Sequence, residues 1–236
     1  MSKGTLFLIP CSLGGEQINQ VIPSYIKEVI NNCNYYIVEN VRSARRFLIK
    51  AGIETKIDDL IFFELNKHTD PQEIPAFLEP TKEGENVGLL SEAGVPGVAD
   101  PGADIVSIAH KNKIKVKPIV GPSSILLALM ASGMNGQNFC FNGYLPRDRQ
   151  ERKKAIQNLE SLSLKNQQTQ IFIETPFRNN HMIEGLSQVC NGETEIVVAT
   201  NLTMDSEKII RMKAKEWKNS KIDLHKKPSV FLIHKY

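Results

Sequence analysis

Short apolar segments alternate with segments of helical spacing along the first half of the chain, and this alternation limits the fold most strongly. The predicted strands are residues 5–9, 35–38, 60–64, 86–90 and 116–120, and the predicted helices are residues 21–30, 43–51, 104–111 and 124–131. Strands that alternate with helices form mainly parallel sheets covered on both faces, so we expect strands such as 60–64 and 86–90 to be buried. Pro118 cannot donate a ladder hydrogen bond, which predicts either an edge position for the fifth strand or a linker there.

The second half of the chain has a different pattern. The predicted strands are residues 139–143, 169–174, 195–200, 207–213 and 229–234, and the predicted helices are residues 149–162 and 178–190. Three successive strands with little helix between them indicate a mixed or antiparallel sheet. We therefore predict an α/β protein of two domains, residues 1–120 with a mostly parallel sheet and residues 121–236 with a mixed sheet.

Composition excludes several classes of protein. The chain has 236 residues, of which 23% are charged and 7% are aromatic, and these values do not fit collagen, a coiled coil or a disordered chain. The net charge of +3 does not demand a nucleic-acid partner. Apolar runs stay far below the roughly 20 residues that span a bilayer, so we expect no membrane segment. Scattered cysteines and histidines predict a reduced, cytoplasmic protein and no metal site.

Three loops rich in small residues follow predicted strands, where open α/β sheets bind their ligands. They cover residues 10–15, 91–102 and 120–124. Taken alone, the first and third are better interpreted as ordinary strand-to-helix turns. The second has twelve residues with three glycines, two prolines and two acids, which is longer than such a turn needs. It carries Glu92 and Asp100 rather than cations, so it favours a ligand with hydroxyls or a positive centre over a phosphate.

Six segments in register carry a resemblance to a known family. They are Pro10–Glu16, Glu39–Leu48, Ser91–Gly102, Val120–Ser124, Ala131–Pro146 and Glu174–Arg178. Across nearly its whole length the chain resembles the tetrapyrrole methylase superfamily of S-adenosylmethionine (SAM) methyltransferases, and within it the ribosomal RNA small-subunit methyltransferase I branch. The second segment departs from the E-D-T-R pattern of that branch at Asn40 and Val41, and residues 200–204 lack three charges of its R-E-L-T-K pattern.

The resemblance implies two α/β domains with a SAM cleft between them. It implies that the loop 91–98 cradles the methionine and ribose parts of SAM, that Pro10 forms a floor, and that Ser123 lies near the carboxylate at a helix N-terminus. Adenine needs apolar walls and backbone hydrogen bonds. The expected cofactor-binding residues are Pro10, Ser91, Glu92, Ala93, Val98, Ser123, Leu145, Thr175, Ala199, Leu202 and Val230.

Candidate catalytic residues lie at the predicted carboxyl ends of strands. Methyl transfer from a sulfonium depends on holding donor and acceptor in line, and a ribose hydroxyl also needs a base or an electrostatic stabiliser. Glu39, Arg42 and Asp100 are the expected catalytic residues. Alternatively, Glu39 and Arg42 form a salt bridge or a helix-capping pair, and Asp100 holds its own loop.

The implied function is SAM-dependent methylation of RNA, at a ribose 2′-hydroxyl of small-subunit ribosomal RNA. The alternatives are methylation of a small molecule such as a tetrapyrrole, and a non-catalytic SAM-binding module. The family analogy predicts a homodimer. The basic run of residues 146–154 contacts RNA phosphates or is a solvated helix face. Phe177 and Arg178 stack on a base or simply begin a helix.

Overall fold

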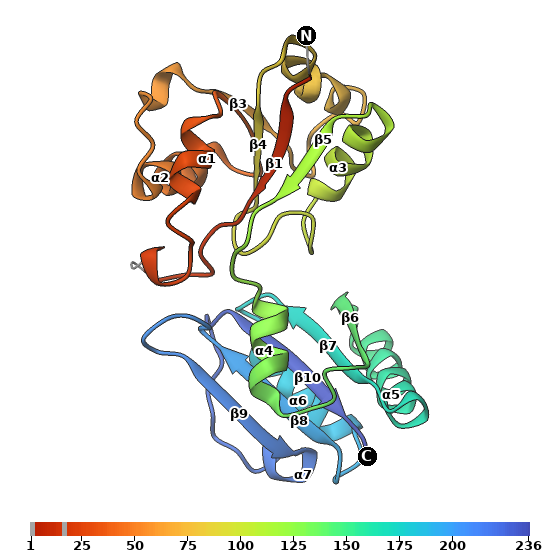
Figure 1. Ribbon diagram of the computed structural model, residues 1–236. Coiled ribbons are helices and arrows are strands. Elements are labelled where there is room, and N and C mark those ends of the chain that lie inside the picture. Colours follow the sequence, from red (N-terminus) through yellow and green to blue (C-terminus); the bar gives the residue numbers. More distant parts are fainter. Residues whose placement is uncertain (1–2, 16–17) are drawn as a thin grey trace. The chain divides into compact units, whose positions relative to one another are not determined.

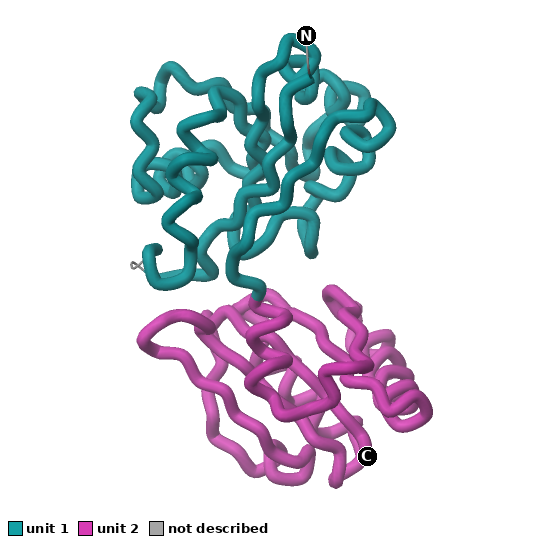
Figure 2. Tube along the Cα trace, in the orientation of Figure 1, with its two compact units in different colours: residues 1–123 teal, residues 124–236 magenta. Residues whose placement is uncertain are grey.

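A computed structural model describes residues 3–15 and 18–236. Glu16, the last residue of the first matching segment, lies outside the described residues. The chain forms two compact units, residues 1–123 and 124–236, whereas the sequence pattern placed the boundary after residue 120 (Figure 2). Both units are α/β structures with a sheet of their own, as predicted.

The sheet of unit 1 is wholly parallel, with the strand order β3-β2-β4-β1-β5. The strands are β1 (Thr5–Ile9), β2 (Tyr35–Val38), β3 (Ile61–Glu64), β4 (Val87–Leu90) and β5 (Lys115–Pro118). β5 is an edge strand and Pro118 is its last residue, which confirms the prediction from that proline. The expectation that residues 60–64 form a buried strand is wrong, because β3 is the other edge and Ile61 is 45% exposed.

Helices cover both faces of the unit 1 sheet (Figure 1). They are α1 (Ile26–Asn31), α2 (Val41–Ala51) and α3 (Gly102–Lys111), with the 3₁₀ helices η1 (Ile18–Gln20), η2 (Ile57–Asp59) and η3 (Ile74–Glu83). Residues of α1 and α2 pack with Ile9 and Tyr36 on one face. Residues of α3 and η3 pack with Leu6 and Ile37 on the other. Burial on both faces explains why the central strands are continuously apolar.

All three α-helices of unit 1 begin elsewhere than the sequence pattern predicted, and α3 does so at Gly102 rather than residue 104. The helix expected over residues 21–30 begins only at Ile26, because Pro23 has no N–H and disfavours helical geometry in the residue before it. α2 begins at Val41 rather than residue 43, because the Asn40 side chain accepts a hydrogen bond of 3.1 Å from the Ser43 amide and caps the helix. The η3 segment was not predicted, since Pro75 and Pro80 interrupt its helical pattern.

The sheet of unit 2 is mixed, as predicted, with the order β6-β7-β10-β8-β9. Its strands are β6 (Phe139–Tyr144), β7 (Thr169–Glu174), β8 (Glu195–Thr200), β9 (Lys208–Lys213) and β10 (Ser229–His234). Only β6 and β7 pair in parallel. The helices are α4 (Ser124–Ser132), α5 (Arg149–Asn166), α6 (Asn179–Val189) and the short α7 (Ala214–Trp217), which was not predicted.

The two faces of the unit 2 sheet have different partners (Figure 1). Phe172 and Phe231 stack at 5.8 Å between ring centres and pack with residues of α5 and α6, including Ile156 and Leu186. α4 packs against β8, β9 and β10. Within residues 3–15 and 18–236, no helix is long and apolar enough to cross a membrane, and no group of His, Cys, Asp or Glu side chains could hold a metal ion.

Candidate functional site

The carboxyl ends of the parallel strands gather the predicted residues of unit 1 at one edge of the sheet, which we call the carboxyl edge. Pro10 follows β1, Glu39 follows β2, and Ser91 and Glu92 follow β4. β4 lies between β2 and β1, so these exits are neighbours. The structure therefore brings together side chains that the sequence separates by up to about eighty positions.

The loops after β1 and β4 are tied directly to each other. The Cys11 amide donates to the Gly94 carbonyl at 2.8 Å, and the Gly94 amide donates to the Cys11 carbonyl at 3.0 Å. The buried hydroxyl of Ser91 donates to the same Gly94 carbonyl at 3.0 Å. Gly94 has a φ of +79°, which favours glycine, and a Cβ there would lie 3.2 Å from the Leu13 side chain. These contacts hold the long glycine-rich loop in one conformation.

Glu39 and Glu92 form a second link across the carboxyl edge. The Glu92 amide donates to Glu39 Oε1 at 3.2 Å, and the Ser43 hydroxyl donates to Glu92 Oε1 at 2.5 Å. Burial raises the pKa of Glu39, and the negative charges of Asp100 and Glu92 raise it further, while the Glu92 amide acts in the opposite direction. Sequence reasoning missed Ser43, although an Asn-x-x-Ser pattern at a helix start is a signal for capping.

Asp100 is engaged within its own loop. Its Oδ1 accepts hydrogen bonds from the amides of Gly97, at 2.7 Å, and Gly102, at 2.8 Å. Partial burial raises the pKa of Asp100, and these two amides oppose that shift. The geometry matches the alternative that Asp100 organises the loop, whose Ala93 and Val98 are exposed.

Arg42 is exposed in the first turn of α2. Within the described residues Arg42 forms neither an ion pair nor a capping pair with Glu39. Asn40 provides the cap of α2 instead, and Glu39 accepts a hydrogen bond from the Glu92 amide. A pocket of about 240 Å³ lies between α2 and the loop after β1. Its lining includes Cys11, Ser12, Ser43, Arg46, Lys50 and Glu92.

Pro10 and the loop after β5 are in close contact. A Cβ added at Gly121 would lie 2.2 Å from Pro10 Cβ, which is closer than real side chains approach. Only glycine therefore lets the 120–124 loop cross the buried Pro10. Ser123 ends unit 1, directly before α4.

The predicted adenine-contacting residues of unit 2 lie at one edge of its sheet. This edge is formed by the ends of β6, β7 and β8 and the start of β10. The predicted residues there are Leu145, Thr175, Ala199, Leu202 and Val230. Val230 pairs with Ile173 of β7 and with Ala199 of β8, so these three side chains share a face.

Leu145 does not share that face. It packs in the core that contains Ile156 and Phe172, on the opposite side of the sheet from Ala199 and Val230. The sequence pattern could not reveal this, because Leu145 follows the register shift that interrupts the β6–β7 pairing. The predicted set is therefore gathered at one edge, but not as one apolar surface.

A buried carboxylate fixes the segment that follows β7. Glu174 Oε1 accepts from the Thr175 amide at 2.7 Å, and Oε2 pairs with an Arg178 guanidinium nitrogen at 2.8 Å. Arg178 is thus held by Glu174 and directly precedes α6, which favours the alternative that it begins a helix. Phe177 stays 65% exposed and contacts the His225 ring edge-to-face at 5.9 Å.

The carboxylates and backbone groups at the carboxyl edge of unit 1 suit a ligand that carries both a positive centre and hydroxyls. The loop of residues 91–102 offers backbone groups beside small side chains, and its charged side chains are both acidic. In unit 2 the buried Thr203 hydroxyl, next to Leu202, has no hydrogen-bond partner within the described residues. Such a group needs a polar partner. SAM has a sulfonium, an ammonium, ribose hydroxyls and a polar adenine edge, so these residues fit it.

Two α/β units, with glycine-rich loops at the carboxyl edge of a parallel sheet, define the class as an α/β ligand-binding protein. Residues 26–218 match the family model described as Tetrapyrrole (Corrin/Porphyrin) Methylases, and the chain belongs to this family. It is therefore a methyltransferase of a SAM-dependent family.

Sequence relatives and solved structures agree with this assignment. The chain is 29% identical to ribosomal RNA small subunit methyltransferase I of Vibrio cholerae, over 98% of this chain and 77% of the relative. It is 32% identical to the Bacillus subtilis protein of the same name, over 88% of this chain and 67% of the relative. The crystal structure of the methyltransferase CobJ aligns with a TM-score of 0.65 at 15% identity, covering 98% of this chain and 94% of that one, which supports the fold alone.

Proposed function

We propose that the chain transfers a methyl group from SAM to small-subunit ribosomal RNA, at a ribose 2′-hydroxyl. The observation that carries the proposal is the alignment of nearly the whole chain with relatives named ribosomal RNA small subunit methyltransferase I. The matching regions include the glycine-rich loop and the acidic side chains at the carboxyl edge of unit 1. The likeness to CobJ is a likeness of fold and does not favour a tetrapyrrole substrate.

SAM binding is assigned to both sheet edges. In unit 1, Pro10, the backbone of residues 91–98 and Ser123 hold the methionine and ribose parts, and the carboxylates of Glu92 and Asp100 favour the cationic groups. In unit 2, Ala199, Leu202 and Val230 supply apolar contacts to adenine, while Thr175 and Leu145 contribute backbone groups. When bound, SAM supplies an electrophilic methyl group on a sulfonium.

Proton removal from the acceptor is assigned to Glu39. Its Oε1 is held by the Glu92 amide, which leaves Oε2 to accept a proton from a ribose hydroxyl. Partial burial and the neighbouring carboxylates raise the pKa of Glu39, and a general base is more effective when its pKa lies closer to the working pH. Arg42, exposed in the first turn of α2 and three residues after Glu39, stabilises the negative charge that develops on the acceptor oxygen or binds a neighbouring phosphate.

Two measurements test this proposal. Isothermal titration measures SAM binding to the full chain, and absence of binding at millimolar SAM would exclude the cofactor. Transfer of tritium from labelled SAM to small ribosomal subunits that lack the modification then tests the substrate. Binding without transfer to particles or to naked ribosomal RNA would favour a non-catalytic module, and transfer to a tetrapyrrole instead would favour the small-molecule alternative.

The cellular setting follows from the proposed substrate. An enzyme that modifies the small ribosomal subunit acts in the cytoplasm. By analogy with the family we also propose a homodimer, which sedimentation equilibrium tests directly.

A further inference from the structure

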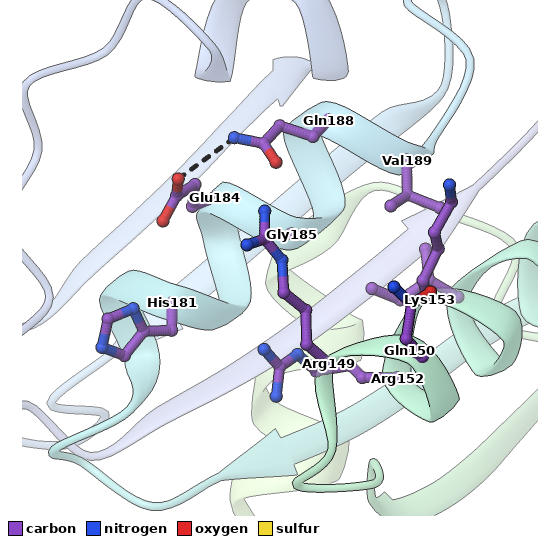
Figure 3. Close-up of a pocket in the computed structure, with 10 residues that line it drawn as sticks. Arg149, Gln150, Arg152, Lys153, His181, Glu184, Gly185, Gln188 and Val189 are labelled. Carbon is purple, nitrogen blue, oxygen red and sulfur yellow. Dashed lines mark hydrogen bonds between the residues drawn. The ribbon is translucent and has the colours of Figure 1, made fainter.

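Outside the proposed SAM site, unit 2 has a groove between α5 and α6 with a volume of about 600 Å³. We call it the α5–α6 groove. Its lining residues are Arg149, Gln150, Arg152, Lys153, Ile156, His181, Glu184, Gly185, Gln188 and Val189. Figure 3 shows these side chains around the space between the two helices. None of them belongs to the proposed SAM site.

The groove is rich in cations that form no ion pair within the described residues. Arg149, Arg152 and Lys153 line it, and none forms an ion pair within the part of the chain that the structure describes. Glu184 is the only acid in the lining, and its Oε1 accepts a hydrogen bond of 3.1 Å from Gln188 (Figure 3). The neighbouring Lys154, by contrast, pairs with Glu151.

Arg152 is held in place by backbone carbonyl groups, which carry no net charge. One of its guanidinium nitrogens donates to the Arg147 carbonyl at 2.9 Å and lies 3.5 Å from the Pro146 carbonyl. Its Nε lies 3.9 Å from the position that a Cβ on Gly185 would occupy, so the glycine leaves room for this side chain across α6. Asp148 is near enough to interact electrostatically with Arg152, but its Oδ1 caps α5 by accepting from the amides of Gln150 and Glu151.

The spacing of the cations suits a chain of phosphates. Arg149 and Lys153 are four residues apart on one helix face, which separates them by roughly 6 Å along the axis. The cations are therefore spread along the groove instead of converging on one point. Arginine forks match phosphate oxygens in two-donor geometry, and His181 adds a donor from α6.

We propose that the α5–α6 groove binds the sugar-phosphate backbone of the RNA substrate. The proposal deepens the proposed function and rests on it for the identity of the RNA. Charge complementarity selects a polyanion, and contacts of this kind position an RNA without reading its sequence. The α5 part of the groove belongs to the basic run of residues 146–154, and the structure adds His181 and Gly185 from α6.

The test is direct RNA binding by the full chain as a function of salt. Fluorescence anisotropy with a labelled fragment of small-subunit ribosomal RNA compares the wild type with the double variant Arg149→Gln/Lys153→Gln. Loss of two phosphate contacts should weaken binding roughly tenfold near physiological salt, and should reduce the slope of log K against log salt by roughly 1.4. The matched control is Lys154→Gln/Lys165→Gln, which removes the same charge from the same helix outside the groove.

A second pair of variants tests the groove without replacing any of its cations. Gly185→Glu places a carboxylate beside Arg152, and Gly185→Gln has nearly the same size without the charge. A Cβ at this position meets no atom closer than 3.7 Å, so both variants should fold. Gly185→Glu should weaken RNA binding severalfold relative to Gly185→Gln, with SAM affinity equal in both.

The outcomes separate this inference from the proposed function. Equal RNA affinity and equal salt slopes for the groove and control variants would overturn the groove, even if the wild type methylates ribosomal particles. Weakened RNA binding in the groove variants supports the groove. Absence of methyl transfer by the wild type would instead count against the proposed function, while the anisotropy data still decide whether the groove binds RNA.

Discussion

The backbone amide of Glu92 donates a hydrogen bond of 3.2 Å to Oε1 of Glu39. Glu92, the second residue after β4, thus orients the Glu39 side chain directly after β2, and the position of Glu39 depends on the folded loop. This bond stabilises the ionised form of Glu39, whereas burial and the charges of Asp100 and Glu92 oppose it. The balance raises the pKa of Glu39, which has consequences for both stability and activity.

Glu39→Gln should stabilise the protein more at neutral pH than in acid. A carboxyl group whose pKa is raised by folding contributes stability below its unfolded pKa, and this contribution is lost as the pH rises through the folded pKa. Because the substituted amide never ionises, the variant avoids that loss. The gain should be less than about 1 kcal/mol because the site is partly solvated. Thermal unfolding at about pH 4 and about pH 7.5 measures it, with exposed Glu64→Gln as the control.

The same Glu39→Gln variant should lose methyl transfer. A general base contributes about 10²- to 10⁴-fold, so the rate with ribosomal particles should fall within that range while SAM affinity stays near that of the wild type. Single-turnover tritium transfer and isothermal titration measure the two quantities. Transfer at the wild-type rate would show that Glu39 is not the base.

Asp100→Ala and Asp100→Asn should differ clearly. Alanine leaves the amides of Gly97 and Gly102 without the acceptor that Asp100 Oδ1 provides, which should cost about 1–3 kcal/mol and weaken SAM binding. Asparagine keeps an acceptor oxygen but not the negative charge, so its stability should be close to that of the wild type and its SAM affinity should fall less than that of Asp100→Ala. If Asp100→Asn keeps SAM affinity but loses transfer, the carboxylate acts in catalysis and not only in the loop.

Strand positions could be predicted from the sequence because central strands that are buried on both faces are rich in apolar residues. Residues 169–174, 195–200 and 229–234 were located to the residue, and the glycine-rich loop after β4 lies where expected. Helix starts were less accurate, since the Asn40 cap and the turn at Pro23 depend on local hydrogen bonds and backbone geometry rather than on periodicity.

Contacts at the site were harder to predict than its location. The rule for parallel sheets brings Glu39 and Glu92 to one edge, but it does not say that an amide of one binds the side chain of the other. The side of the sheet to which Leu145 points was also out of reach, because one register shift reverses it. The α5–α6 groove could not be predicted either, because part of its lining comes from α6, whose Gly185 lies far from residues 146–154 in the sequence.

Gly121→Ala should destabilise unit 1 and disturb the proposed SAM site. The new methyl group would lie 2.2 Å from Pro10 Cβ, so either the 120–124 loop or the end of β1 must shift. Forced overpacking of this kind costs about 1–3 kcal/mol. Chemical denaturation should show this loss, and SAM affinity should fall. Gly136→Ala, where a Cβ meets no atom within 4 Å, is the control and should be close to neutral. Wild-type SAM affinity in a destabilised Gly121→Ala protein would argue against Pro10 as a floor of the site.

Arg42→Ala should separate cofactor binding from transfer. Arg42 is exposed and forms no ion pair in the described residues, so its removal should leave the free energy of unfolding within about 0.5 kcal/mol of the wild type. SAM affinity should stay within about twofold, whereas transfer to ribosomal particles should fall at least tenfold because a charge near the acceptor is lost. Arg42→Lys keeps the charge and should restore part of the rate. A large loss of SAM affinity in Arg42→Ala would instead make Arg42 a cofactor-binding residue, and unchanged transfer would remove it from the mechanism.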